Sequence, residues 1–592
     1  MVVLFLASAL IGSGILFHHK RILTYIAAAG VLFEGELLLT TLLHRTLFQY
    51  IDGPTFFLIA SVLYTTIFLA LYKQWKHPYS TPGSGLRDMY AAILLFVVLA
   101  AAYPIVQHNG FHGEDFILHG FYNGDVVTFA SLVQKSFDTS LLVTQNPFSG
   151  NGSLEYPTLL HGAVSDLFSL LHVYKDWLYF WSIMTFIQIC ITIPMFFLVW
   201  DTVFPEPVAQ EEKWLGVSSR HTIYILQTLI SAVAIGLSFD SFSYPQSHFF
   251  LIGIFLGVIA LLAKALSLSG KQQIFPVTTG ATLAALLLLS NTVTGTAAAG
   301  AVGVFCIIRI FDKKRSPMER GFFLLFAFAI LVFMKNASVG RTTLSHLHFS
   351  VSSASDMIRA GLPTLFVLGA ALYSLARKQY IAITAAAISS LGFIIFFLSD
   401  RNIVTENASR FLYHGFLIGS VLLLPLAVQY LYFIKRELLF TLRPMSERIG
   451  GWIAVASGAL IILLPIGIST ASTYVSLLGP GEYHVSVSDR TLLWWIDENV
   501  KSNEVIIVNP NEPFLVPLFT GRAMLRAHDY WLSQDDEISQ DLEAAYTGNT
   551  SAQKNIIKQG SYIILTSEEV KQWNTSSFKK MMASENAAIY KI

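Results

Sequence analysis

The stretch that decides the fold runs from residue 108 to 176 and reads HNGFHGEDFILHGFYNGDVVTFASLVQKSFDTSLLVTQNPFSGNGSLEYPTLLHGAVSDLFSLLHVYKD. It lies between two strongly apolar runs, so we expect it to leave the bilayer. Helices are predicted from Asp125 to Phe137, where apolar residues recur at helical spacing, and from Pro157 to about Val173. Acidic amphipathic helices beside a membrane indicate a site at the water–lipid boundary.

The composition places most of the chain in a membrane. Of 592 residues, 54% are hydrophobic and only 13% are charged, which is typical of polytopic membrane proteins. The formal net charge of zero gives no reason to expect nucleic-acid binding. Two cysteines are too few for a disulfide framework or a cysteine zinc site.

About fourteen membrane helices are predicted over residues 1–478, as an all-α bundle. Their apolar runs are Val2–Phe17, Ile22–Leu43, Phe56–Leu71, Met89–Val106, Trp177–Val199, Ile223–Leu237, Phe249–Ala265, Phe275–Leu289, Thr294–Ile310, Phe322–Met334, Leu362–Leu375, Ile381–Leu398, Phe411–Phe433 and Trp452–Ile468. Alternate loops carry twenty Lys and Arg residues, whereas the opposite loops carry eight in a greater total length. Because Lys and Arg concentrate in cytoplasmic loops, the N-terminus, the 108–176 loop and the C-terminus are predicted to be extracytoplasmic in a multi-pass cell-membrane protein.

Residues 479–592 are predicted to form a small soluble α/β domain on the same outer side. WWIDENV has the pattern of a helix, EVIIVN and SYIILT have the pattern of buried strands, and AIYKI is expected to be a last strand. The segment contains no glycine-rich loop of the kind that cradles nucleotide phosphates. A lid or a platform for the acceptor is therefore expected rather than a nucleotide-binding domain.

Asp125 is the candidate catalytic residue. It follows Gly124 and opens the first loop helix, where free backbone N–H groups and the helix dipole keep a carboxylate ionised. An ionised carboxylate suits a general base. The alternative interpretation is a simple helix N-cap, and the spacing alone favours it.

The metal candidates are His112, Glu114 and Asp115, with His119 close by in the sequence. Carboxylate oxygens and imidazoles are ligands that Mg²⁺ or Mn²⁺ accepts. The spacing matches no diagnostic metal motif, and a solvated loop explains the cluster equally well.

Five further residues are candidates for substrate binding. Four of them are aromatic or imidazole side chains in outer loops, suited to a sugar or a phosphate: Tyr156, His161, Tyr244 and His248. Helix anchoring at the interface and polar turns are the alternatives for these four. The fifth, Arg410, is predicted at the outer mouth of a helix, where a guanidinium clamps a phosphate through two hydrogen bonds or reaches to the membrane surface as an anchor.

Glu34 and Glu36 lie inside the second apolar run. Acids inside a membrane are costly, so each one raises a functional hypothesis, here a proton or ion path. Pairing within the helix bundle is the alternative for both.

Several segments resemble the GT-C superfamily of polytopic membrane glycosyltransferases. The outer-loop pattern GDVVTFASLVQKSF followed by NPFSGNGSLEYPTLLHG is similar to the first catalytic loop of many such enzymes, and SYPQSHF and NASRFLYHGF are similar to later outer loops. The resemblance covers about residues 89–530 and implies a sugar donor carried on polyprenyl phosphate. It also implies that Asp125 is the loop carboxylate and that Arg410 binds the donor phosphate.

The C-terminal region is similar to that of the oligosaccharyltransferase catalytic subunit, through RTLLWWIDENVKSNEVIIVNP and PLFTGRAMLRAHDYW. It departs from that subunit where the WWDYG signature is expected, because this chain has NPNEPFLVP there. The DXD pattern of the family's loop is absent too. These departures argue against recognition of a peptide sequon and against a required metal.

The resulting hypothesis is a glycosyltransferase that moves a sugar from a polyprenyl-phosphate donor to a glycan, lipid or protein on the extracytoplasmic face. Asp125 and Arg410 are expected to face one outer cavity, roughly 6–15 Å apart. A polytopic transporter or flippase is one alternative, since Glu34 and Glu36 are compatible with it. A non-catalytic protein with the GT-C fold is another.

The topology predicts that Lys314 is cytoplasmic and Ser551 extracytoplasmic. Single cysteines placed at these positions are expected to differ in labelling by a maleimide that does not cross membranes. Labelling of both cysteines from the same side would contradict the predicted helix count.

Overall fold

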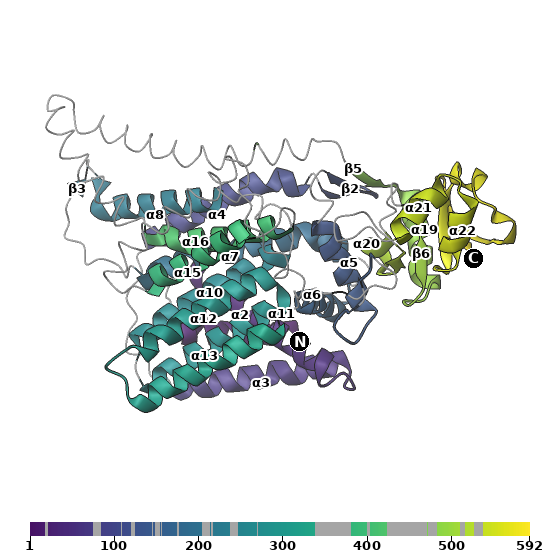
Figure 1. The fold of residues 1–592 in the computed structure, drawn as a ribbon. Coiled ribbons are helices and arrows are strands. Elements are labelled where there is room, and N and C mark those ends of the chain that lie inside the picture. The colour runs from purple at the N-terminus through teal and green to yellow at the C-terminus, as the bar shows by residue number, and fades with distance from the viewer. Residues whose placement is uncertain are drawn as a thin grey trace, which may run out of the picture.

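The computed structural model describes residues 1–17, 22–74, 85–107, 109–119, 125–144, 146–148, 154, 157–173, 177–203, 213–214, 217–236, 247–268, 270–337, 380–398, 403–422, 471, 482–509, 516–525 and 537–592. Long helices run roughly side by side in a bundle, and a sheet covered by shorter helices lies at one end of it (Figure 1). The chain therefore divides into a helical bundle, a loop region and a C-terminal unit, residues 482–592.

The bundle consists of long apolar helices. These are α1 Val2–Phe17, α2 Ile22–Thr46, α3 Gly53–Gln74, α4 Gly85–Gln107, α7 Trp181–Val203, α8 Ser219–Gly236, α10 Ser247–Ser267, α11 Ile274–Ser290, α12 Thr292–Ile310, α13 Pro317–Ala337, α15 Tyr380–Leu398 and α16 Ile403–Gly419. Five described segments are long and apolar enough to cross a membrane: Ile22–Thr46, Gly53–Leu71, Trp177–Thr202, Phe250–Ser267 and Thr292–Ile310. This confirms a multi-pass membrane protein. The count of fourteen stays a prediction, because the runs 362–375 and 452–468 lie outside the described residues.

Small residues let the central helices approach closely. A Cβ atom added at Gly30 of α2 would lie 2.8 Å from the Ile191 side chain of α7, and one at Gly257 of α10 would lie 2.9 Å from Val31. Between membrane helices there is little hydrophobic driving force, so close packing of this kind supplies much of the attraction. The bundle centre is accordingly dense, with Phe255, Leu256 and the neighbouring α10 side chains fully buried.

The loop region combines a hairpin with two helices. Strands β1 Gly110–His112 and β2 Asp115–His119 pair antiparallel, and β5 Glu482–Val485 of the C-terminal unit adds to β2. The polar cluster at 112–119 therefore belongs to a sheet and not to a plain loop. The loop helices are α5 Asp125–Phe137, with the predicted bounds, and α6 Leu159–Leu170, inside the predicted 157–173.

The C-terminal unit contains a five-stranded sheet in the order β7-β6-β8-β10-β9. Its strands are β6 Val505–Ile507, β7 Ala523–Met524, β8 Tyr562–Thr566, β9 Lys579–Ala583 and β10 Ala587–Lys591, and its helices are α19 Val487–Asn499, α20 Val516–Thr520, α21 Glu537–Tyr546 and α22 Thr550–Ile557. Strand β6 is parallel to both β7 and β8, whereas β10 is antiparallel to its neighbours. The helix predicted at WWIDENV and the strands predicted at EVIIVN, SYIILT and AIYKI are all present.

Alternation along the strands gives this sheet two buried faces. Ile506 and Ile564 join the core that continues into the loop region and the bundle, together with residues of α19 and α20. Ile507 and Ile563 point to the other face, where they form a separate core with α21 and α22. Since successive side chains in a strand point to opposite faces, one short apolar run serves both layers. The unit is thus packed onto the rest of the protein through one of its faces. Its status as a separate domain stays a prediction.

Gly521 lies where the C-terminal unit meets α5. Its φ of 65° is in the left-handed region. An added Cβ atom would lie 3.0 Å from the Gln134 carbonyl oxygen and from the Lys135 Cα atom of α5. Only glycine combines that backbone conformation with so close an approach.

We expect Gly521→Ala to lower the stability of the protein more than Gly113→Ala does. Gly113 has nearly the same φ, 66°, but an added Cβ atom there meets nothing within 4 Å. Both variants therefore carry a left-handed backbone penalty of about 1–2 kcal/mol, and only Gly521→Ala also pushes against α5. The thermal unfolding midpoints of the two purified variants test this. Equal losses would show that the contact with α5 is not tight.

Candidate functional site at the loop helices

Asp125 is the first residue of α5, as the preceding glycine predicted. Its side chain lies outside the described residues, but the helix that carries it is well defined. The helix α5 is buried on all its faces: every residue from Val126 to Val133 is buried, and Val126, Ala130 and Val133 belong to the main core. The orientation of α5 therefore depends on the core around it and on what holds its C-terminal end.

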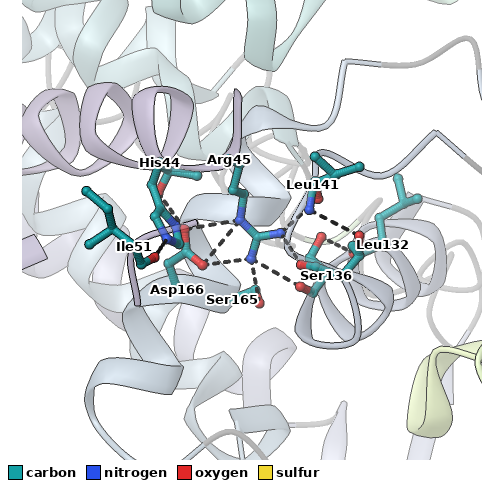
Figure 2. Close-up of polar contacts among 10 residues, drawn as sticks. His44, Arg45, Ile51, Leu132, Ser136, Leu141, Ser165 and Asp166 are labelled. Carbon is teal, nitrogen blue, oxygen red and sulfur yellow. Dashed lines mark hydrogen bonds and ion pairs between the residues drawn. The ribbon is translucent and has the colours of Figure 1, made fainter. Parts of the chain in front are cut away.

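A buried ion pair holds the C-terminal end of α5 to the bundle (Figure 2). Arg45, in the last turn of α2, lies 2.7 Å from Asp166 of α6 through its Nη2 and the acid's Oδ1. Its Nε atom lies 3.2 Å from both carboxylate oxygens, and Thr41 Oγ1 donates to Asp166 Oδ2 at 2.9 Å. The two side chains are only 4% and 12% exposed, so this is an interior pair and not a surface contact.

The same guanidinium binds backbone carbonyls at the end of α5. Nη2 donates to the Ser136 carbonyl oxygen at 3.1 Å, and Nη1 donates to those of Thr139 and Leu141 at 2.9 and 3.1 Å. The last carbonyls of a helix lack partners within the helix, so a cation placed there satisfies them and favours the helix dipole. Arg45 thus joins α2, α6 and the end of α5 in one network.

A second arginine holds the end of α5 from the C-terminal unit. Arg522 pairs with Asp138 just after α5 and donates to the carbonyl oxygens of Val500 at 2.7 Å and Asp497 at 2.8 Å. Lys135 of α5 donates to the Ser502 carbonyl oxygen at 2.8 Å, and burial lowers the pKa of this amine. The C-terminal unit is therefore fastened to the loop helix by buried polar contacts.

The C-terminal part of α5 has a third anchor. Trp177, at the start of the 3-10 helix η2 Trp177–Phe180, donates its indole N–H to Gln134 Oε1 at 2.7 Å. These anchors fix the C-terminal part of α5, and the burial of residues 126–133 fixes the rest. The helix thus presents its first residue in a reproducible position, which a catalytic group requires.

His161 of α6 is an interior residue. It is 1% exposed and its ring centroid lies 4.9 Å from that of Phe129 in α5. Burial lowers the pKa of His161 to about 3, against the opposing hydrogen bond to Thr158, so the imidazole is neutral. In this arrangement His161 packs α6 against α5, and its burial argues against direct contact with a substrate.

The remaining substrate-binding candidates are only partly described. Arg410 lies in α16, half-buried, and its carbonyl oxygen accepts a hydrogen bond from His414 Nδ1 at 2.6 Å. His248 is in the first turn of α10, but its side chain lies outside the described residues, as do Tyr156 and Tyr244. A shared cavity of Asp125 and Arg410 stays a prediction.

The metal candidates take part in the hairpin. His112 and Asp115 are partners in its register, and Glu114 is exposed in its turn. Asp115 lies 3.2 Å from His484 Nε2 of β5 and accepts from the Val487 backbone N–H at 3.3 Å. No group of three His, Cys, Asp or Glu side chains in the described part of the chain is arranged to hold a metal ion. The described residues do not fit a metal, so no chemistry is assigned to one, and metal dependence stays an untested prediction.

Glu34 and Glu36 have neighbours within the bundle. Gln188 of α7 donates to Glu34, and Ser8 of α1 donates to Glu36 Oε1 at 2.9 Å. Hydrogen bonds of this kind are the pairing within the bundle that was the alternative to an ion path. They connect α2 to α7 and to α1. They give the transporter hypothesis no added support.

The pair formed by Arg45 and Asp166 was not singled out from the sequence. Asp166 was one of seven acids in the loop, and Arg45 was one of the few basic residues in the outer loops. An arginine at the end of an apolar helix in a basic-poor loop is the signal that singles out such a partner.

We expect Asp166→Asn to destabilise the protein by about 3 kcal/mol, because it leaves Arg45 buried without its counter-charge. The double variant Arg45→Met/Asp166→Leu should be better tolerated than either single change, because it removes both charges. Glu319→Gln is the matched control, since that acid is 38% exposed and pairs with Arg315 at 3.6 Å, and it should change little. Free energies of unfolding of the purified proteins measure all of these variants. A loss for Asp166→Asn no larger than for Glu319→Gln would contradict the structural role of the pair.

No family model and no curated protein sequence matches this chain. Its structure is similar to that of the archaeal oligosaccharyltransferase AglB from Archaeoglobus fulgidus, solved with an inhibitory peptide and a dolichol-phosphate. That match has a TM-score of 0.50 and 10% identity, and it covers 81% of this chain and 69% of AglB. ArnT from Cupriavidus metallidurans, solved with undecaprenyl phosphate, aligns at a TM-score of 0.45 and 11% identity over 84% of this chain and 97% of ArnT. The likeness to AglB shows that this chain has the fold of the GT-C glycosyltransferases.

Proposed function

We propose that this protein is a membrane glycosyltransferase that uses a sugar carried on polyprenyl phosphate. The observation that carries the proposal is the likeness in fold to AglB over 81% of the chain, since AglB was solved with a dolichol-phosphate. The outer-loop sequence around Asp125, which resembles the catalytic loop of the same superfamily, points to the same activity.

The proposed reaction is a single displacement at the anomeric carbon of the donor sugar. An acceptor hydroxyl attacks that carbon, the bond from carbon to phosphate oxygen breaks, and polyprenyl phosphate leaves with the electron pair. Asp125 takes the proton of the attacking hydroxyl, which is general base catalysis. A carboxylate at a helix N-terminus is kept ionised by the helix dipole, as this role requires.

A general base must be held in a fixed position, and the contacts of α5 provide this for its first residue. Arg45, Arg522 and Trp177 hold α5 from three separate elements, so the helix that begins with Asp125 has little freedom to tilt. Precise placement of reacting groups accounts for a large part of enzymatic rate acceleration. This support extends to the C-terminal unit, which we interpret as a part of the catalytic framework and as the platform for a glycan, lipid or protein acceptor.

Arg410 is proposed to bind the donor phosphate. A guanidinium forms paired charge-assisted hydrogen bonds with a phosphate and stabilises the charge that develops on the leaving group. Its place on α16, at the start of an apolar helix segment, suits a ligand whose lipid tail lies between helices.

Asp125→Asn is expected to lower the turnover number by about a hundredfold or more, because the amide cannot accept the proton. The matched control is Asp52→Asn, the same substitution beside the start of α3, where Asp52 Oδ2 accepts from the Thr55 backbone N–H at 2.9 Å. That variant should keep normal turnover. Arg410→Ala should instead raise the donor KM. Unchanged turnover in Asp125→Asn would remove Asp125 from the mechanism.

A further inference from the structure

A buried guanidinium at the junction of the hairpin, η2 and α19 has no counter-charge among the residues that the structure describes. Arg490 is 3% exposed and forms no ion pair among the described residues. Its Nη1 donates to the Tyr179 hydroxyl at 3.3 Å, and its Nε is buried without a hydrogen bond in the described part of the chain. A buried charge that lacks a partner is strongly unfavourable, so this site is incomplete as it stands.

Two aromatic rings lie next to this guanidinium. The Arg490 Cζ atom lies 5.3 Å from the ring centroids of both Phe111 and Trp494. Phe111 is itself held by Tyr179, whose ring stacks on it at 3.9 Å. Cation–π contacts of this kind use no N–H donor, so they leave the N–H groups of the guanidinium for recognition. These N–H groups match the two oxygens of a phosphate or carboxylate.

The nearest acid in sequence does not compensate the charge. Asp489 accepts hydrogen bonds from Ser486, Ser584 and Asn586 instead. Its carboxylate therefore connects the turn between β9 and β10 to α19. Arg490 is left near the N-terminal end of α19, where the helix dipole also disfavours a cation and favours an anion.

The site lies beside a candidate membrane span, and the side chains that cover it are exposed. Phe111 follows shortly after the end of α4. Tyr179 belongs to η2, which directly precedes α7, and both lie in the candidate membrane span Trp177–Thr202. Tyr179 is 49% exposed and Trp494 is 52% exposed, so aromatic side chains cover the guanidinium on its outer side. Tyrosine and tryptophan are enriched at the depth of the lipid headgroups, and the anion most abundant at that depth is phosphate.

We propose that Arg490, with Trp494 and Tyr179 beside it, binds a phosphate group at the membrane surface. The ligand supplies the missing negative charge, and the bound headgroup holds the hairpin, η2 and α19 together at the boundary. The proposal involves neither Asp125 nor Arg410 and does not depend on the proposed transferase activity.

The test uses the full-length protein in a maltoside detergent, which contains no phosphate. Dioctanoyl phosphatidic acid, inorganic phosphate and the uncharged dioctanoylglycerol are titrated by calorimetry. The wild type should bind phosphatidic acid and should not bind dioctanoylglycerol at the same site. Inorganic phosphate binding as tightly as phosphatidic acid would identify a free phosphate as the ligand, whereas preference for phosphatidic acid would identify a lipid headgroup.

Arg490→Gln should weaken phosphatidic acid binding by about tenfold or more, the loss expected for a charge-assisted contact. Arg490→Lys, which keeps the charge but loses the planar fork, should give an intermediate loss. Lys501→Gln is the control, since it removes an exposed positive charge from the same unit, and it should leave affinity within about twofold. Without any phosphate ligand, Arg490→Gln should unfold at a temperature no lower than the wild type.

Equal affinity in the wild type and Arg490→Gln would overturn the proposal, as would the absence of phosphatidic acid binding by the wild type. Failure of both Arg490 variants to fold would overturn it too, because the guanidinium would then be a structural requirement that needs no anion.

Discussion

The ion pair between Arg45 and Asp166 is the constraint on which the loop region depends. Removing two charges from water costs several kcal/mol per ion, and only good geometry with further hydrogen bonds recovers that cost. Here the carboxylate also accepts from Thr41, and the guanidinium also donates to three backbone carbonyl oxygens at the end of α5. The pair therefore fixes the loop helices relative to the bundle. Apolar packing alone is non-directional and would allow these helices to slide.

Arg522 performs the corresponding task on the other side of α5. Its contacts with Asp138 and with the carbonyl oxygens of Val500 and Asp497 attach the C-terminal unit to the same helix end. A Cβ atom added at Gly521 would lie only 3.0 Å from the backbone of α5. The C-terminal unit therefore also packs closely against this helix. The C-terminal part of one short helix thus collects contacts from Arg45, Trp177 and Arg522, which lie far apart in the sequence. This explains how a residue at its first position can be placed precisely.

Local patterns predicted the elements well. The helix from Asp125 to Phe137 has the expected bounds because its apolar spacing and the glycine before it act within the segment itself. Strands such as Val505–Ile507 were recognisable because a run buried on both faces is apolar throughout. The hairpin at 110–119 was not predicted, because its short strands gain stability from β5, more than 360 residues later in the chain. Arg45 and Asp166 lie 121 residues apart, and Arg490 meets Tyr179 across 311 residues. A local pattern can mark one member of such a pair but not its partner. The packing of His161 against Phe129 was not predicted for the same reason.

The central claim is that a chain with this fold transfers sugars from lipid carriers. Its most direct test is incubation of the purified full-length protein with a panel of polyprenyl-phosphate sugars and with glycan, lipid and peptide acceptors. The account predicts that at least one donor loses its sugar to an acceptor and releases polyprenyl phosphate in equal amount. If the folded protein binds these donors but transfers no sugar from any of them, the account is contradicted, and a binding role on the GT-C fold takes its place.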